Sequence, residues 1–135
     1  MANQLEQELQ TSITNIPECV AAGYVDLSTG MLLAIRTVDS HPQEVLEMLA
    51  AATADMFQGP NVVAIENMFK KARGVDDAGH YFNEMIVNSD NLIHIFIRGK
   101  QNQEHVVGFV CRKSANLGMA LTKARASMPT LENAL

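Results

Sequence analysis

Five strand-like runs of apolar residues, joined largely by short polar links, constrain the fold of this chain more than any other feature of its sequence. The runs cover residues 19–26, 31–37, 81–87, 92–98 and 106–112. The turn sequence Leu27-Ser-Thr-Gly30 joins the first two runs and predicts a β-hairpin. Short links favour antiparallel neighbours, because a parallel crossover needs about a dozen residues or more. We therefore expect an antiparallel sheet.

Four further segments have apolar residues at helical spacing: residues 2 to about 15, 40–57, 60–73 and 114–128. Ser40 and Ser114 are the expected N-caps of the second and fourth helices, and Gly59-Pro60 separates the second helix from the third. The tail from residue 129 to 135 is expected to be frayed. The element order α-β-β-α-α-β-β-β-α predicts an α+β fold, with helices on both faces of a five-stranded antiparallel sheet.

Composition and charge limit the function classes. The 135 residues suffice for a single domain with its own core. A net charge of −5 disfavours nucleic-acid binding, which needs the opposite sign to meet phosphates. The N-terminus lacks the features of a signal peptide, and no apolar run is long enough for a membrane span. We expect a cytoplasmic protein with no membrane insertion and with reduced thiols.

No constellation of residues predicts catalysis, a cofactor or a metal site. The four histidines have neither i,i+4 helical spacing nor a neighbouring cysteine, and no phosphate-binding loop or nucleophile elbow is present. If the first and last strands are antiparallel neighbours, Cys19 and Cys111 could lie close together. Close thiols can be redox-active, but buried cysteines that pack as small apolar side chains are much commoner, and we favour that interpretation.

The chain has more apolar surface than one small core requires. The apolar residues of the second helix sweep about half of its circumference, and the third strand carries apolar residues on both faces. A bare edge strand of this kind invites uncontrolled pairing, which favours an isologous homodimer that covers it. The hypothetical dimer interface consists of Met56, Phe57, Tyr81, Asn83, Met85 and Val87.

Two stretches resemble the roadblock/dynein light-chain superfamily. The run from Val20 to Ala34 is similar to the family's small-residue strand, Asp, Gly turn and second apolar strand, and Asn116-Leu-Gly118 is similar to the entry into its last helix. The resemblance implies strands in the order 2-1-5-4-3, numbered along the chain, with a central helix pair on one face and the terminal helices on the other. The Gly59-Pro60 break departs from the long central helix that the family commonly keeps.

The resemblance also implies a function. Family members usually dimerise through the central helix and third strand into a ten-stranded sheet. They serve as non-enzymatic platforms for Ras-like small GTPases, motor subunits or membrane-associated scaffolds, and in bacteria they often stimulate a partner GTPase. On that hypothesis, Arg36, Arg98 or Lys100 could dock an acidic partner surface, although solvated surface charge is the commoner role.

The alternative hypothesis is a small-ligand sensor or an enzyme that uses a pocket between the sheet and a helix. Small residues at Ala21, Ala22, Gly23 and Gly108 could leave room for such a ligand. They more often permit close packing of helices.

Overall fold

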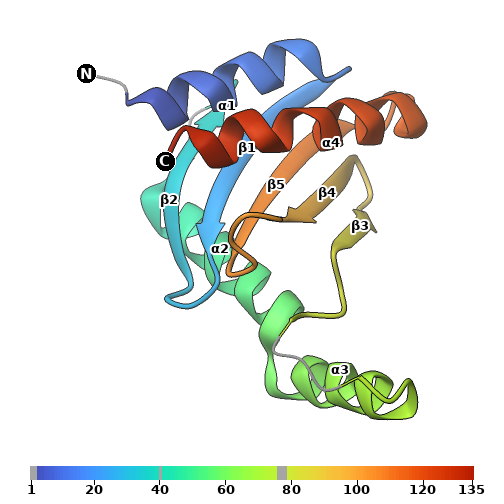
Figure 1. Cartoon of the computed structure of the whole chain (residues 1–135). Coiled ribbons are helices and arrows are strands. Elements are labelled where there is room, and N and C mark those ends of the chain that lie inside the picture. The colour runs from blue at the N-terminus through green and yellow to red at the C-terminus, as the bar shows by residue number, and fades with distance from the viewer. Residues whose placement is uncertain (1–2, 40, 76–78) are drawn as a thin grey trace.

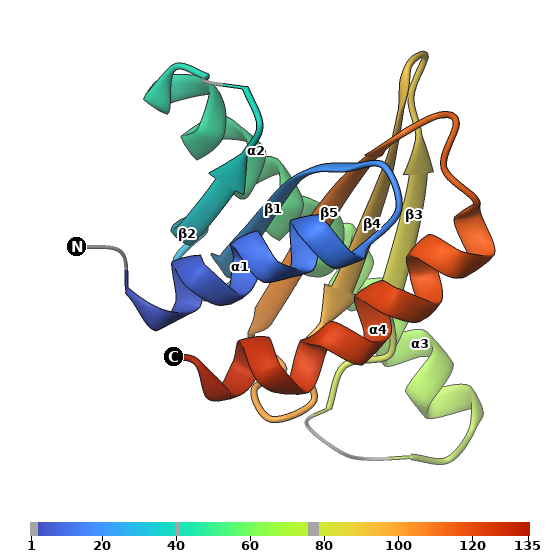
Figure 2. The same ribbon diagram turned by 90° about the horizontal axis from the view of Figure 1, so that it is seen from above.

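The computed structural model describes residues 3–39, 41–75 and 79–135. Its elements, in chain order, are α1 (Gln4–Asn15), β1 (Cys19–Asp26), β2 (Met31–Thr37), α2 (Gln43–Gln58), α3 (Pro60–Ala72), β3 (Glu84–Asn88), β4 (Leu92–Arg98), β5 (His105–Arg112) and α4 (Leu117–Asn133). The strands form one antiparallel sheet in the order β2-β1-β5-β4-β3. Helices α1 and α4 cover one face of the sheet, and α2 lies on the other (Figures 1 and 2). The α+β fold and the predicted strand order are confirmed.

The larger core lies between the sheet and the two terminal helices. Alternate residues of β4 point toward it, and the predicted apolar face of Ile93, Ile95 and Ile97 is buried there. The stripe of α1 packs on the same side, with Leu9 fully buried. A smaller cluster under α2 consists of Val25, Leu27, Ala50, Phe57 and Val106.

The ends of several elements differ from prediction. The N-cap of α2 is Pro42, and Ser40 lies outside the described residues. Asn116, not Ser114, caps α4 by accepting a hydrogen bond from the Met119 N–H at 2.9 Å. An asparagine side chain at this position satisfies an N–H that has no partner within the helix.

The prediction of a frayed tail is wrong, because α4 continues through Pro129 to Asn133. Leu131 is fully buried in the main core. The Glu132 carboxylate accepts hydrogen bonds from the backbone N–H groups of Lys100, Gln101 and Asn102. These tertiary contacts hold the last turn in place although proline removes one hydrogen bond of the helix.

The expectation that both central helices cover one face holds for α2 alone. The predicted break is present at Gly59, whose extended backbone (φ −59°, ψ 159°) ends α2 and lets α3 begin at Pro60 in a new direction. In Figure 1, α3 projects away from the end of the sheet. The one buried residue in α3 is Glu66. We call α3 and the chain from residue 79 to 83 that packs on it the arm.

Candidate interaction surface

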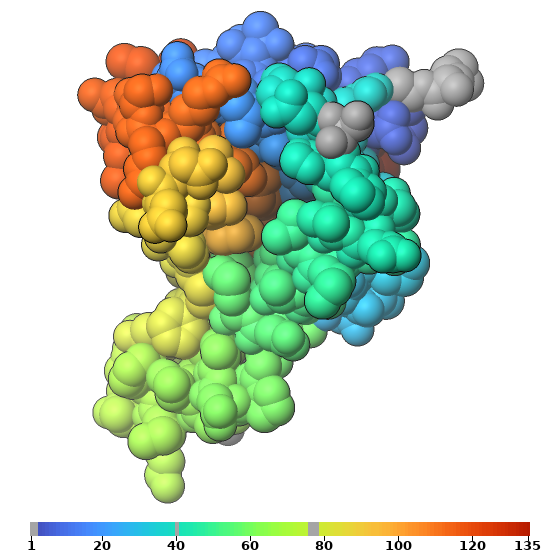
Figure 3. Space-filling view, turned by 180° about the vertical axis from the view of Figure 1, so that it is seen from behind, coloured from blue at the N-terminus to red at the C-terminus, as the bar shows by residue number. Residues whose placement is uncertain are grey.

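The sheet is incompletely covered on the side of α2. This helix packs on β1 and β2, and it leaves much of β3, β4 and β5 without a helix above them. Figure 3 shows a hollow on this side, between α2 in teal and strands β3 and β4 in yellow. Residues that face this side include Val87 at the edge and half-buried His94 and Phe96. The Phe96 ring also covers Gly108, where an added Cβ would lie 3.1 Å from it.

An apolar stripe on α2 borders this hollow. It consists of Val45, Met48, Leu49 and Ala52, which share one side of the helix at i, i+3, i+4 and i+7 and are all exposed. Met48 is 74% exposed, which is unusual for a methionine on a helix that also contributes to the core. Met56 continues the stripe and packs on the same apolar cluster as Met85 and Phe96. The stripe therefore points toward the uncovered strands.

The two edge strands of the sheet differ in regularity. On β2, Leu33 is an extra residue, because Tyr24 pairs with Ala34 while the next residue, Val25, pairs with Leu32. Such a bulge disrupts the ladder and discourages pairing with another strand. By contrast, β3 is in regular register with β4 over its whole length. Of the two edges, β3 is the one suited to extend the sheet.

The structure separates the six predicted interface residues into three groups. Val87 is exposed on β3, and Met56 and Met85 are half-buried beside the hollow. Tyr81 and Asn83 precede β3 and belong to the arm. Phe57 is 0% exposed and lies in the cluster under α2, so its inclusion in a surface is wrong. Sequence periodicity placed it on the wide apolar face of α2, and only packing shows which part of that face is inside.

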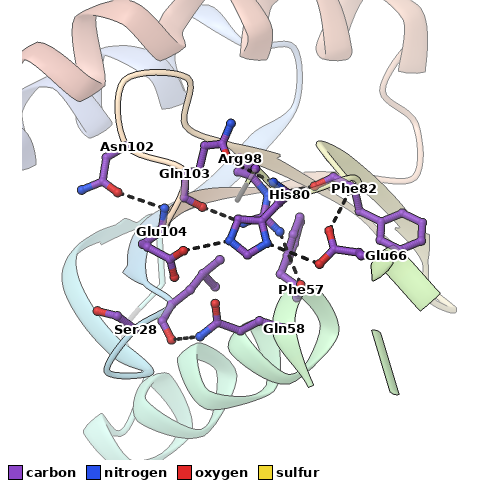
Figure 4. A network of polar contacts seen from close by, with 12 residues as sticks. Ser28, Phe57, Gln58, Glu66, His80, Phe82, Arg98, Asn102, Gln103 and Glu104 are labelled. Carbon is purple, nitrogen blue, oxygen red and sulfur yellow. Dashed lines mark hydrogen bonds and ion pairs between the residues drawn. The ribbon is translucent and has the colours of Figure 1, made fainter. Parts of the chain in front are cut away.

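Glu66 ties α3 to the chain immediately before β3 (Figure 4). Its carboxylate accepts hydrogen bonds from the backbone N–H groups of Tyr81 at 2.6 Å and Phe82 at 3.1 Å, and it lies 3.3 Å from His80 Nδ1. Burial alone would raise the pKa of Glu66, but these hydrogen bonds outweigh it and hold the pKa below its usual value. The same contacts explain why β3 begins at Glu84 rather than at Tyr81, because two N–H groups are directed to Glu66 instead of to a strand.

Arg98 is buried beside this anchor, which corrects its assignment as a surface charge. Arg98 is 3% exposed, and its guanidinium donates hydrogen bonds to the carbonyls of Phe82, Gln103 and Phe57. Burial lowers its pKa, while the charges of Glu66 and Glu104 oppose this shift. Arg98 therefore joins β4, α2 and the arm and cannot dock a partner.

His80 completes the network of Figure 4, with one ring nitrogen near Glu66 and the other 2.8 Å from Glu104.

The other two candidate docking cations remain at the surface. Arg36 lies 3.5 Å from Glu6, and Lys100 is exposed. The sequence alone did not predict that Glu66 anchors α3, although its position on the helix was a sign of it. Glu66 is the acidic residue that interrupts the apolar side of α3 between Val62, Ile65 and Phe69.

The two cysteines lie side by side, as their predicted strand positions suggested. Cys19 and Cys111 are paired across β1 and β5, and both are buried in the main core. A hydrogen bond to Cys111 and burial raise the pKa of the Cys19 thiol, which disfavours its reactive thiolate form.

A surface depression of about 550 Å³ lies where the start of β3 meets the end of β4 and the following loop. It is lined by Asn83, Glu84, Ile97, Arg98, Gly99, Lys100 and Gln103. Two of its charges are already engaged, since Arg98 binds carbonyls and Glu84 binds Arg125 through both oxygens. The depression is not the pocket between sheet and helix that the ligand-sensor hypothesis requires.

Within residues 3–39, 41–75 and 79–135, no three His, Cys, Asp or Glu side chains are grouped as they would be to hold a metal ion. Over the same residues, no helix has the length and apolar character needed to cross a membrane.

Comparison with solved structures identifies the fold. The gliding protein MglB from Thermus thermophilus superposes with a TM-score of 0.71 at 16% sequence identity, over 96% of this chain and 87% of that chain. A Roadblock/LC7 domain from Streptomyces avermitilis gives 0.71 at 8% identity, over 98% and 97% of the two chains. MglB in a tetrameric arrangement gives 0.70 at 18% identity, over 98% and 90%.

Searches of the sequence itself find no matching protein-family profile and no matching curated protein. The chain therefore has the roadblock/LC7 fold, as the resemblance of its sequence implied, at a sequence identity low enough that the likeness concerns the fold alone.

Proposed function

We propose that this chain, with its roadblock/LC7 fold, is a homodimeric interaction module that regulates or scaffolds a Ras-like small GTPase and has no catalytic site of its own. The observation that carries the dimer is the regular edge of β3, which lies across the hollow from the exposed apolar stripe of α2. A two-fold axis at β3 pairs this edge with its own copy and continues the sheet. The same axis brings the α2 helix of each copy toward the hollow of the other copy.

The apolar stripe supports this arrangement over a bare monomer. Met48 and Leu49 are 74% and 55% exposed, and Val87 at the nearby edge is 40% exposed. The residues of the stripe form one exposed apolar patch on α2, and such a patch marks a site of association. MglB, one of the proteins with this fold, has been solved in a tetrameric arrangement, so self-association of this domain has a precedent.

The GTPase partner rests on the resemblance to the roadblock superfamily and on the exclusion of other classes. The acidic chain carries no phosphate-binding loop, so it is suited to contact a nucleotide-binding protein rather than the nucleotide. Its contribution would be to position the switch regions of the GTPase, because phosphoryl transfer depends mainly on positioning and electrostatic stabilisation.

The dimer is tested by a charge on the β3 edge. Val87→Lys is expected to convert a particle of twice 14.8 kDa into a monomer, measured by light scattering, because a lysine on an edge strand opposes pairing. Leu33→Lys is the matched control, since Leu33 on the other edge strand is also 40% exposed. It should leave the mass unchanged. A wild type that runs as a monomer at tens of micromolar would refute the dimer.

The partner is tested in two steps. A tagged chain is cross-linked in its native host, the captured proteins are identified by mass spectrometry, and any small GTPase among them is purified. Direct binding and single-turnover GTP hydrolysis are then measured with the wild type and with Val87→Lys. Capture of no small GTPase, or neither binding nor a change in hydrolysis with the purified protein, contradicts the proposal.

A further inference from the structure

We propose that α3 is a clasp that packs on the second copy of the chain, at the turn between the partner's β3 and β4. This inference rests on the proposed homodimer, and it assigns a surface outside the α2 stripe and the β3 edge. Three features of the arm carry it: a fixed orientation, an uncovered apolar strip, and a position set by the pairing of β3.

The arm is held in one orientation by contacts within its own chain. Glu66, 3% exposed, binds the two backbone N–H groups that lie just before β3. The Phe69 ring packs on the Tyr81 ring with their centroids 4.9 Å apart, and the Arg73 guanidinium lies over the same ring. A helix anchored by a buried carboxylate and an aromatic cluster presents a defined surface. The helix is thus prepared to bind without first being ordered.

The anchored side of α3 leaves an adjacent apolar strip uncovered. It consists of Ile65, Met68 and Ala72, at i, i+3 and i+7, all of them exposed. Ile65 is 42% and Met68 69% exposed, in a helix whose one buried residue is Glu66. The sheet of the same chain does not cover this strip, because α3 projects beyond its end (Figures 1 and 3).

The pairing of β3 determines which part of a second copy would face α3. In an antiparallel pair about a two-fold axis, the start of each strand lies beside the end of the other. Glu84 begins β3 and Asn88 ends it, and Glu66 fixes α3 to the residues just before Glu84. The arm of each copy is therefore directed to the turn that follows Asn88 of the partner subunit.

The charges at this junction are complementary. Lys71 is exposed at the basic end of α3, and Asp90 is exposed in the turn between β3 and β4. In the proposed dimer, Lys71 approaches Asp90 of the partner subunit, and the contact occurs twice because the interface is isologous. Each copy has a net charge of −5, so two copies repel each other. The positive charge of Lys71 at the contact reduces this repulsion.

The apolar part is tested with Met68→Asp, and Asn67→Asp serves as the matched control on another side of the same helix. Each substitution enters the dimer twice. Met68→Asp is therefore expected to raise the dissociation constant of the dimer about 100-fold, measured by sedimentation equilibrium. Asn67→Asp should change it less than about threefold. Thermal unfolding followed by circular dichroism verifies that both variants fold.

The charged part is tested by reversal. Lys71→Glu and Asp90→Lys should each weaken the dimer, and the double variant should recover at least half of the combined loss, because the pair is then restored with its signs exchanged. Absence of this recovery shows that the two residues do not meet and overturns the proposed position of α3.

The two proposals fail in different ways. If Val87→Lys yields a monomer while Met68→Asp dimerises like the wild type, the homodimer stands and the clasp is wrong. If the wild type itself is a monomer, both are wrong. If Met68→Asp weakens binding of a purified GTPase but leaves the dimer unchanged, the strip serves that partner and the clasp is again wrong.

Discussion

Glu66 and Arg98 are the charged side chains on which the position of the arm depends. Both are 3% exposed. Glu66 accepts hydrogen bonds from the backbone N–H groups of residues 81 and 82. Arg98 donates to the carbonyls of Phe82, Gln103 and Phe57. Burying charge is costly unless it is paired and hydrogen-bonded. Here these hydrogen bonds offset the cost, so removing either side chain leaves two or more backbone N–H or carbonyl groups without that partner.

Glu66→Gln is expected to lower the free energy of unfolding by about 1–3 kcal/mol at pH 7, since hydrogen bonds to a charged acceptor are replaced by weaker ones. The folded-state pKa of Glu66 lies below its usual value of 4.5. Its contribution is therefore present above pH 4.5 and is lost as the pH falls through the folded-state value. The difference between wild type and variant should stay constant from pH 7 to about pH 5 and shrink in more acidic urea titrations.

Glu104→Gln provides the control, because Glu104 is the other carboxylate beside His80 and is 43% exposed. Its effect should stay below about 1 kcal/mol. Equal losses in the two variants would mean that the contacts of both carboxylates with His80, not the backbone N–H groups bound by Glu66, hold the arm.

Among the elements, α4 shows how tertiary contacts override a local signal. A proline late in a helical pattern commonly ends it, and sequence alone predicted fraying after Pro129. The structure keeps the helix because Leu131 is buried in the core and Glu132 binds the loop after β4. The pattern of β4, with alternate isoleucines, was predictable residue by residue because a strand with one buried face has a period of two.

Deletion of residues 130–135 tests this role of the last turn. We expect a loss of about 3–6 kcal/mol in unfolding free energy, from the burial of Leu131 and from the N–H groups that Glu132 now satisfies. Deletion of Leu135 alone, which is 61% exposed, should be nearly neutral. Circular dichroism during thermal unfolding separates the two. A truncated chain as stable as the wild type would mean that the last turn contributes nothing to stability, as a frayed tail would.

At the scale of the whole molecule, α2 leaves part of the sheet without a helix over it, and its own apolar stripe is exposed. The sequence predicts surplus apolar residues on α2 and on the third strand, and the exposed stripe and edge agree with that prediction. It could not tell the inner part of the apolar face of α2 from the outer. Phe57 was assigned to the surface for this reason and is in the core.

Stability should depend on protein concentration if folding is linked to dimerisation. The melting temperature of the wild type is expected to rise by a few degrees for each tenfold increase in concentration, because association stabilises the folded state by mass action. Val87→Lys should melt at a lower temperature that is independent of concentration. Scanning calorimetry over a hundredfold range distinguishes the two, and a wild-type melting temperature that does not vary would count against an obligate dimer.

The sequence by itself determined the element order, the antiparallel sheet and the break at Gly59-Pro60, because periodicity, turn residues and link lengths are local properties of the chain. Its resemblance to the roadblock superfamily supplied the strand order. Only the tertiary structure decided that Arg98 is buried, that Glu66 anchors α3, and that α3 leaves the sheet as an arm. Each of these depends on contacts between residues distant in sequence, and such contacts determine which polar groups find partners and which apolar surfaces remain uncovered.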